Sequence, residues 1–278
     1  PSDCATRRMP PSPGSSRTRR STNVSSEGVS IPVRQTIGAD LELTSSRFLG
    51  AHNAQLEAFY VWHTDPAGTG TPASERTARG VRVSFPNDVW SGHVSLREFG
   101  REWDPAVGFA PRNGFRRLQP SIQWAPRPSW DAVRQVRMGT SFEYLTDLGG
   151  RLETQRLTVT PLGVEFEGGD GAGVDVESVF ERLAEPFEIS EGVVLPPGDY
   201  RFGDVEARLH TTSRRRMWGH VQFSVGEFWS GRRHRLATGV GVRPAGGVDL
   251  FADVERQDVS LPQGDFATTL VRMRANWH

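Results

Sequence analysis

Hydrophobic and polar residues alternate with a period of two over most of this chain. In the segment 53–64, Leu56 and Tyr60 share one face, whereas Gln55 and Glu57 share the other. Such alternation predicts β-strands with one apolar and one polar face. Thirteen segments show it: 36–44, 53–64, 79–85, 90–98, 115–124, 132–146, 155–166, 173–182, 200–210, 218–229, 233–243, 247–256 and 266–277. Because nothing helical lies between them, consecutive strands are expected to pair antiparallel, as an up-and-down meander.

The length of these strands bears on their environment. Most reach ten to fourteen residues, whereas soluble strands usually have about five or six and a tilted membrane-spanning strand needs about nine to eleven. A soluble protein would bury the apolar faces, but a membrane barrel turns them to lipid and encloses the polar faces in its lumen. Alternation fits both arrangements, and strand length favours the membrane barrel.

Charges of both signs recur on the polar faces. We expect these side chains to line the lumen: Glu57, Arg82, Arg97, Arg137, Glu143, Glu177, Glu206, Arg208, Asp253, Arg272 and Arg274.

The connections and the tryptophans add to this picture. Counted from 45–52, the three longest connections are the second, fourth and eighth: 65–76, 99–113 and 183–199. Even-numbered connections of a meander all emerge at the same end. Long loops at one end and short turns at the other are typical of outer-membrane barrels. Six tryptophans lie at or near predicted strand ends, where an aromatic girdle would sit: Trp62, Trp90, Trp124, Trp218, Trp229 and Trp277. Core tryptophans are the alternative interpretation.

Two long connections have the composition of ordered loops. The stretch 101–117 offers these candidates for a lid or a ligand contact: Trp103, Asp104, Phe109, Arg112, Arg116 and Arg117. The aromatics are too apolar to hang in water, and the arginines could pair with lumen carboxylates, so a lid or plug is expected. Stacking on a sugar is the alternative. The segment 181–202 has the same ordered character.

Composition narrows the classes of function. The 278 residues carry 33 basic and 33 acidic side chains, so net charge gives no reason to expect a nucleic-acid partner. Cys4 is the sole cysteine, which leaves no disulfide and no thiolate metal site. Residues 1–34 are rich in Ser, Pro and Arg without a hydrophobic signal core, and are predicted to be a disordered or non-native leader. A signal sequence is expected upstream of this fragment.

Catalytic patterns are weak. No GxSxG motif and no histidine cluster at metal-ligand spacing occurs, although His210 and His220 could face each other across the turn 211–215. The pairs Glu165/Glu167 and Asp175/Glu177 are what any polar strand face supplies, and the segment GGDGAG reads as a hairpin turn. We therefore expect no catalytic residue, no metal and no cofactor.

Four segments stand out as long motifs: WDPAVGFAPRNGFRRL, LTDLGGRLETQRLTVTPLGVEFEGGD, VFERLAEPFEISEGVVLPPGDYRF and GDFATTLVRMRANW. They resemble the C-terminal region of a bacterial family of unknown function, over about residues 35–278. Members of that family join an N-terminal family-9-like carbohydrate-binding module to an outer-membrane-type β-barrel. The resemblance implies a barrel whose strands continue beyond Trp277. The odd number of strands also fits a truncated barrel, since complete bacterial barrels have even numbers.

These observations predict an all-β protein, an antiparallel meander barrel of outer-membrane type with about thirteen strands present over 35–278. Its expected role is a passive anchor or pore associated with carbohydrate binding or uptake. Outer-membrane lipid and carbohydrate are the expected partners. The main alternative is a soluble all-β protein that binds or hydrolyses glycans. A fragment that has no function of its own and aggregates through its edge at 266–277 is the third.

Overall fold

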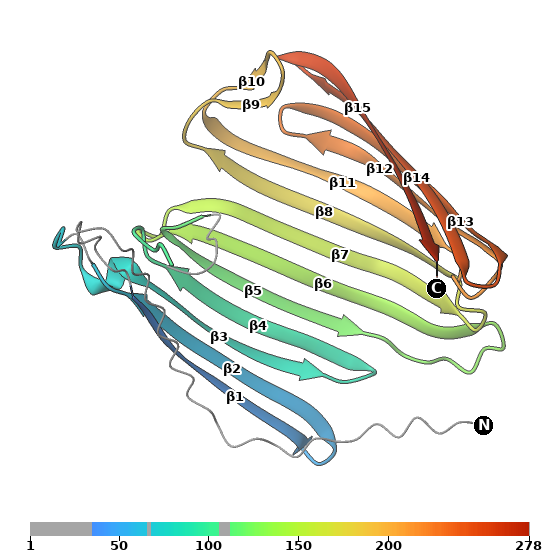
Figure 1. The fold of residues 1–278 in the computed structure, drawn as a ribbon, viewed down its shortest axis with the longest axis horizontal. Helices are drawn as coiled ribbons and strands as arrows, with labels where there is room; N and C mark the ends of the chain where they lie inside the picture. Colours follow the sequence, from blue (N-terminus) through green and yellow to red (C-terminus); the bar gives the residue numbers. More distant parts are fainter. Residues whose placement is uncertain (1–34, 66–67, 106–111, 278) are drawn as a thin grey trace. The chain divides into compact units, whose positions relative to one another are not determined.

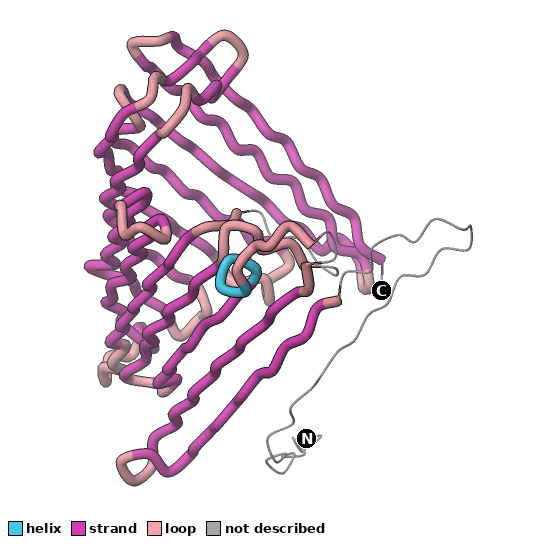
Figure 2. Tube along the Cα trace, turned by 90° about the vertical axis from the view of Figure 1, so that its left-hand side faces the viewer, coloured by secondary structure: helices cyan, strands magenta, loops and turns pink. Residues whose placement is uncertain are grey.

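The computed structural model describes residues 35–65, 68–105 and 112–277. Most of the described residues lie in β-strands, and the single-turn 3-10 helix η1 (Ala73–Arg76) is drawn in cyan in Figure 2. No helix in the described ranges is long and apolar enough to cross a membrane.

Thirteen long strands follow one another in sequence order in one sheet (Figure 1). They are β1 (Thr36–Phe48), β2 (His52–His63), β3 (Thr77–Pro86), β4 (Trp90–Phe99), β5 (Phe115–Trp124), β6 (Val133–Asp147), β7 (Leu152–Phe166), β8 (Gly171–Leu183), β11 (Gly198–His210), β12 (Met217–Phe228), β13 (Gly231–Ala245), β14 (Val248–Leu261) and β15 (Gly264–Trp277). Consecutive strands pair antiparallel. All thirteen predicted strands and their meander order are confirmed.

The described residues group into two compact units. The first unit comprises residues 35–87 and 93–117, and the second comprises 88–92 and 118–277. We describe each unit by itself.

Strand register sorts the side chains onto two faces. In the first unit Glu57 lies opposite Arg82, and their neighbours Leu56 and Val83 lie opposite each other in the next row. Because successive side chains of a strand point to opposite faces, the two pairs occupy different faces of the sheet. We call the face that carries Glu57 and Arg82 the charged face, and the other the apolar face.

The second unit follows the same rule. Its charged face carries Glu206 and Asp253, and its apolar face carries Val205 and Val240. Register shifts interrupt the β6–β7 pairing at three points, the β7–β8 pairing between Val159 and Leu162, and the β13–β14 pairing between Val242 and Ala245. Outside these shifts the predicted alternation holds.

The three longest connections, 64–76, 100–114 and 184–197, are the second, fourth and eighth of the meander. Even-numbered connections emerge at one end of a meander, which we call the long-loop end, and this end also carries the short connections 148–151, 229–230 and 262–263. The other end, with 49–51, 87–89, 125–132, 167–170, 211–216 and 246–247, is what we call the short-turn end. Here Asp88 accepts hydrogen bonds from Arg127 Nε and Nη2, both at 2.8 Å. These bonds hold the pKa of Asp88 below its ordinary value.

Candidate functional site

An ion-pair network covers the charged face of the second unit. Arg235 is its centre: Nη1 donates to Glu206 on β11 at 3.2 Å, and Nε donates to Glu255 on β14 at 2.9 Å. Next to it, Arg233 Nη2 donates to Asp204 at 2.5 Å. Each pair joins neighbouring or next-but-one strands, so the charges tie the sheet together across its face.

Most of the other predicted lumen charges in this unit form further pairs on the same face. The further contacts are Arg137 with Glu165 at 2.6 Å, Arg156 with Glu177 at 3.4 Å, Arg208 with Asp175, Arg272 with Asp253 at 2.6 Å and Gln119 with Glu143 at 3.3 Å. Arg274 lies on the charged face opposite Phe251. Asp253 is the most buried of these carboxylates.

Loss of the central arginine should be costly. We expect Arg235→Met to lower the free energy of unfolding by about 1–2 kcal/mol, because it leaves Glu206 and Glu255 facing each other without their shared donor. Urea unfolding followed by circular dichroism measures this change.

The matched control is Arg127→Met at the short-turn end. Arg127 pairs with the carboxylate of Asp88, and both side chains are about half exposed or more, so its loss should cost clearly less than the loss of Arg235. Equal effects of the two substitutions would show that the network adds nothing beyond ordinary surface pairs.

The first unit carries the three remaining predicted charges on its charged face. Glu57 accepts a hydrogen bond from Gln55 Nε2 at 2.9 Å, and Arg82 Nε donates to Ser84 Oγ at 3.0 Å. Arg97 of β4 lies near both groups, since Glu57 and Arg82 act on it electrostatically. The three side chains therefore lie close together on the charged face.

The connection 100–114 folds back onto the end of β2. Trp103 is buried, with 6% of its surface exposed, and its ring packs against the buried ring of His63 at 5.6 Å. His63 Nε2 lies 2.8 Å from the Glu102 carbonyl oxygen and 3.2 Å from the Asp104 amide nitrogen. Asn113 Nδ2 donates to the Trp103 carbonyl at 2.5 Å. Residues 102–104 and Asn113 of this connection are therefore held against the end of β2.

The other candidates in this stretch separate. Asp104 and Arg112 are exposed, Arg117 lies on the charged face, and Phe109 lies outside the described residues. Arg116 differs from expectation: its Nε donates to Glu98 at 2.5 Å on the apolar face. The idea that Arg116 pairs with a lumen carboxylate is wrong, because Arg116 and Leu118 are two positions apart on β5 and both point to the apolar face. Trp103 is too buried to stack on a sugar.

The connection 184–197 contains a hairpin that sequence analysis missed. Strands β9 (Phe187–Ser190) and β10 (Val193–Leu195) pair antiparallel (Figure 1). Val193 and Leu195 pack against Val259 and Leu261 of β14 in the buried hydrophobic cluster of the second unit. Val259 and Asp253 are an even number of positions apart on β14, so their side chains point to the same face. The hairpin therefore covers the charged face at the long-loop end. The expectation of an ordered loop folded onto the sheet is met.

Trp229 supports the hairpin from the turn between β12 and β13. Its backbone is left-handed, with φ at 52°, which is unusual for a bulky residue. Its ring contacts those of Phe187, Tyr200 and Phe202 at 5.2 to 6.1 Å. These contacts hold the strained turn, and they place Trp229 in the cluster and not in an aromatic girdle.

Aromatic rings also cover the charged face at the short-turn end of the second unit. Trp218 lies across Gly241, and His220 lies across Gly239, where a Cβ would come within 2.5 Å of its ring. Glycine is required there because a side chain would displace the rings. Trp218 therefore faces the charged side, which corrects its assignment to a lipid-facing girdle.

The two histidines near this end do lie opposite each other in register, as predicted. His220 Nε2 is 3.6 Å from Asp253 Oδ2. Among the described residues no group of three or more His, Cys, Asp or Glu side chains is arranged to hold a metal ion.

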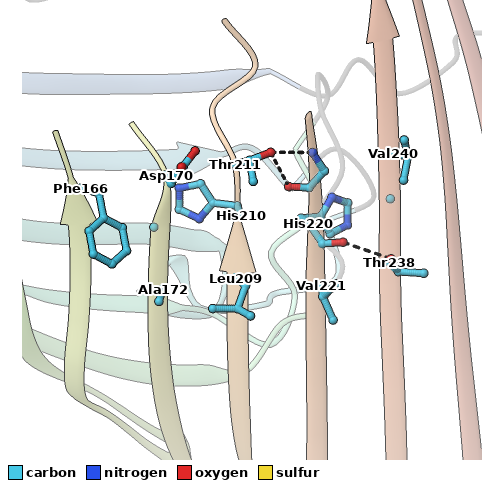
Figure 3. Close-up of a pocket in the computed structure, with 13 residues that line it drawn as sticks. Phe166, Asp170, Ala172, Leu209, His210, Thr211, His220, Val221, Thr238 and Val240 are labelled. Carbon is cyan, nitrogen blue, oxygen red and sulfur yellow. Dashed lines mark hydrogen bonds between the residues drawn. The ribbon is translucent and has the colours of Figure 1, made fainter. Parts of the chain in front are cut away.

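A shallow depression of about 390 Å³ lies on the apolar face of the second unit (Figure 3). Phe166, Leu209, Val221 and Val240 surround it. Its hydroxyl groups are used within the sheet, since the Gly219 amide donates to Thr211 Oγ1 at 2.8 Å and Thr238 Oγ1 donates to the His220 carbonyl at 3.2 Å. The depression therefore presents methyl and ring surface, which suits a hydrocarbon chain better than a sugar.

The paired carboxylates are held as ion-pair partners. Glu165 accepts from Arg137 and Arg134, and Asp175 accepts from Thr160 at 2.6 Å besides Arg208. Because their oxygens are occupied by these partners, the two carboxylates suit a charged lining.

No protein-family model, curated protein or solved structure matches this chain. The family resemblance of its motifs stays a prediction.

Sequence analysis missed part of the network: Asp204, Arg233, Arg235 and Glu255. All four lie within predicted strand segments and on the same faces as the predicted lumen charges, so the alternation itself is the signal that identifies them.

Proposed function

We propose that this chain is an outer-membrane β-barrel protein of bacteria that serves as a passive anchor or pore. One observation carries the proposal: large hydrophobic side chains stay exposed along strand after strand, whereas the charges on the opposite face are partly buried and paired. Examples on the apolar face are Val94, Leu96 and Ile122, which are about half exposed. Contiguous apolar surface of this kind is rare on soluble monomers and is what lipid covers.

The charged face would then line the lumen. Fixed charges of both signs, such as those around Arg235, would set the selectivity for solutes by electrostatics. The hairpin β9–β10 and the connection 100–114 would each constrict the pore at the long-loop end. The association with carbohydrate binding or uptake rests on the motif resemblance.

Two neighbouring positions on β15 provide the test. Leu270 is on the charged face and Val271 on the apolar face, and they are exposed to a similar extent, 50% and 53%. In a Cys4→Ala background, Leu270→Cys should react with a small water-soluble thiol reagent in lipid bilayers, and Val271→Cys should not.

The two cysteine variants would give a different result if the protein were soluble. If the chain stays dispersed without detergent or lipid and both cysteines react at similar rates, the apolar face is not covered by lipid. The proposal would then be wrong, and the soluble glycan-binding or glycan-hydrolysing alternative would replace it.

A further inference from the structure

In the first unit, the apolar face ends at a row of polar side chains near the long-loop end. We call Tyr60, Arg79, Glu98 and Arg116 the arginine row; they come from the four successive strands β2 to β5. Tyr60 lies opposite Arg79 in register. Arg79 Nη2 donates to Glu98 Oε1 at 2.7 Å, and Arg116 Nε donates to Glu98 Oε2 at 2.5 Å. Three strands are thereby joined at one level.

The arginine row carries more positive than negative charge. Two guanidinium groups share the single carboxylate of Glu98, which leaves a net charge of about one unit. The side chains of Arg79 and Arg116 are 57% and 48% exposed, whereas that of Glu98 is 21% exposed. A guanidinium has five N–H donors in a planar fork that fits the oxygens of a phosphate. The row therefore presents donors and positive charge outward.

The surroundings of the row indicate where its ligand comes from. Two residues toward the short-turn end, Val81 and Leu96 form an exposed apolar band. Toward the long-loop end, Arg76 lies 5.8 Å above the ring of Trp62. An apolar band followed by Tyr, Trp and Arg has the composition of the boundary between lipid hydrocarbon and water.

We propose that the arginine row binds the phosphate group of anionic lipid headgroups. This inference rests on the proposed membrane location, because only a lipid places a phosphate directly at the edge of an apolar band. A free phosphate ion would find the same donors, but would gain nothing from the hydrocarbon-level residues beside them. The row would also fix the depth of the barrel in the bilayer, since moving it into hydrocarbon would desolvate two arginines.

Competition between brominated lipids tests the inference. The full chain is placed in bilayers of phosphatidylcholine with a rising share of phosphatidic acid, and either lipid carries brominated acyl chains that quench tryptophan fluorescence. An uncompensated arginine at an anionic surface favours the anionic lipid by about fivefold. We expect that preference in the unaltered chain, its loss in Arg79→Gln/Arg116→Gln, and an increase in Glu98→Gln.

The control is Arg82→Gln/Arg97→Gln, which removes the same charge from the charged face, with both sites on strands that also carry the row. It should retain the preference. Equal quenching by both lipids, or loss of preference in the control as well, would overturn the inference while leaving the membrane location intact. No quenching by either lipid would overturn the membrane location and the inference together.

Added inorganic phosphate distinguishes a lipid headgroup from a free phosphate ion as the ligand. Inorganic phosphate added at constant ionic strength, against chloride, should leave the preference unchanged. If phosphate abolishes it, the row is a site for the soluble ion and the lipid assignment is wrong. Because Glu98→Gln predicts a gain, a folding failure of the double variant does not remove the test.

Discussion

Leu195→Ala is expected to lower the free energy of opening of the β9–β10 hairpin by about 2–5 kcal/mol. Leu195 is 0% exposed and lies at the centre of the cluster formed with Val193, Val259 and Leu261. Its truncation removes hydrophobic contact and leaves a cavity that the strands of the sheet cannot collapse to fill. Hydrogen exchange of the amides in 184–197 measures the opening free energy directly.

Val194→Ala is the control for this prediction. Val194 belongs to the same short strand but is 45% exposed, so its truncation should change the opening free energy by less than about 0.5 kcal/mol. If both variants exchange as the unaltered chain does, the hairpin is not held by its core. If the hairpin constricts a pore, single-channel conductance in planar bilayers should also rise in the Leu195 variant and not in the Val194 variant.

The strands could be predicted because each one repeats a simple local rule. Alternation over ten or more residues specifies both the strand and the face of every side chain, and Glu57 and Arg82 fall in register as that rule requires. The polar faces could be assigned for the same reason. Even the opposition of His210 and His220 follows from a short turn between two regular strands.

The folded connections could not be predicted in the same way. Strand β10 (Val193–Leu195) has three residues, which is too short for its alternation to be recognised. Its burial depends on contact with Val259, more than sixty positions away. The ordering of Trp103 depends likewise on the ring of His63. Tertiary contacts, and not local propensity, fix these segments.

The pattern predicts the strand-end position of all six tryptophans but not the side of the sheet on which Trp218 and Trp229 lie. All six tryptophans lie at or next to strand ends, yet Trp218 lies over Gly241 on the charged face and Trp229 lies in the hairpin cluster. A strand end sets the depth of a side chain, whereas parity and the neighbouring glycine set the face. Parity would have identified Trp218, since it matches that of His220.

The environment of the apolar face stays a prediction, and Val240→Arg tests it at one position. Val240 is 52% exposed on β13 and lines the apolar depression. At the midplane of a bilayer an arginine on the lipid face costs about 2–4 kcal/mol, and near the interface about 0–1 kcal/mol. On a water-exposed face it would change stability by less than about 0.5 kcal/mol. Unfolding in lipid vesicles therefore separates the two environments.

Depth dependence makes this test specific to lipid. Ala245 is also exposed and lies on the same strand, next to the short turn at 246–247, so Ala245→Arg should cost no more than about 1 kcal/mol in vesicles. A general intolerance of β13 to arginine would make both substitutions costly, and a water-exposed sheet would make both nearly neutral. Only a hydrocarbon layer centred near Val240 makes the first expensive and the second cheap, because desolvation of the guanidinium rises toward the midplane.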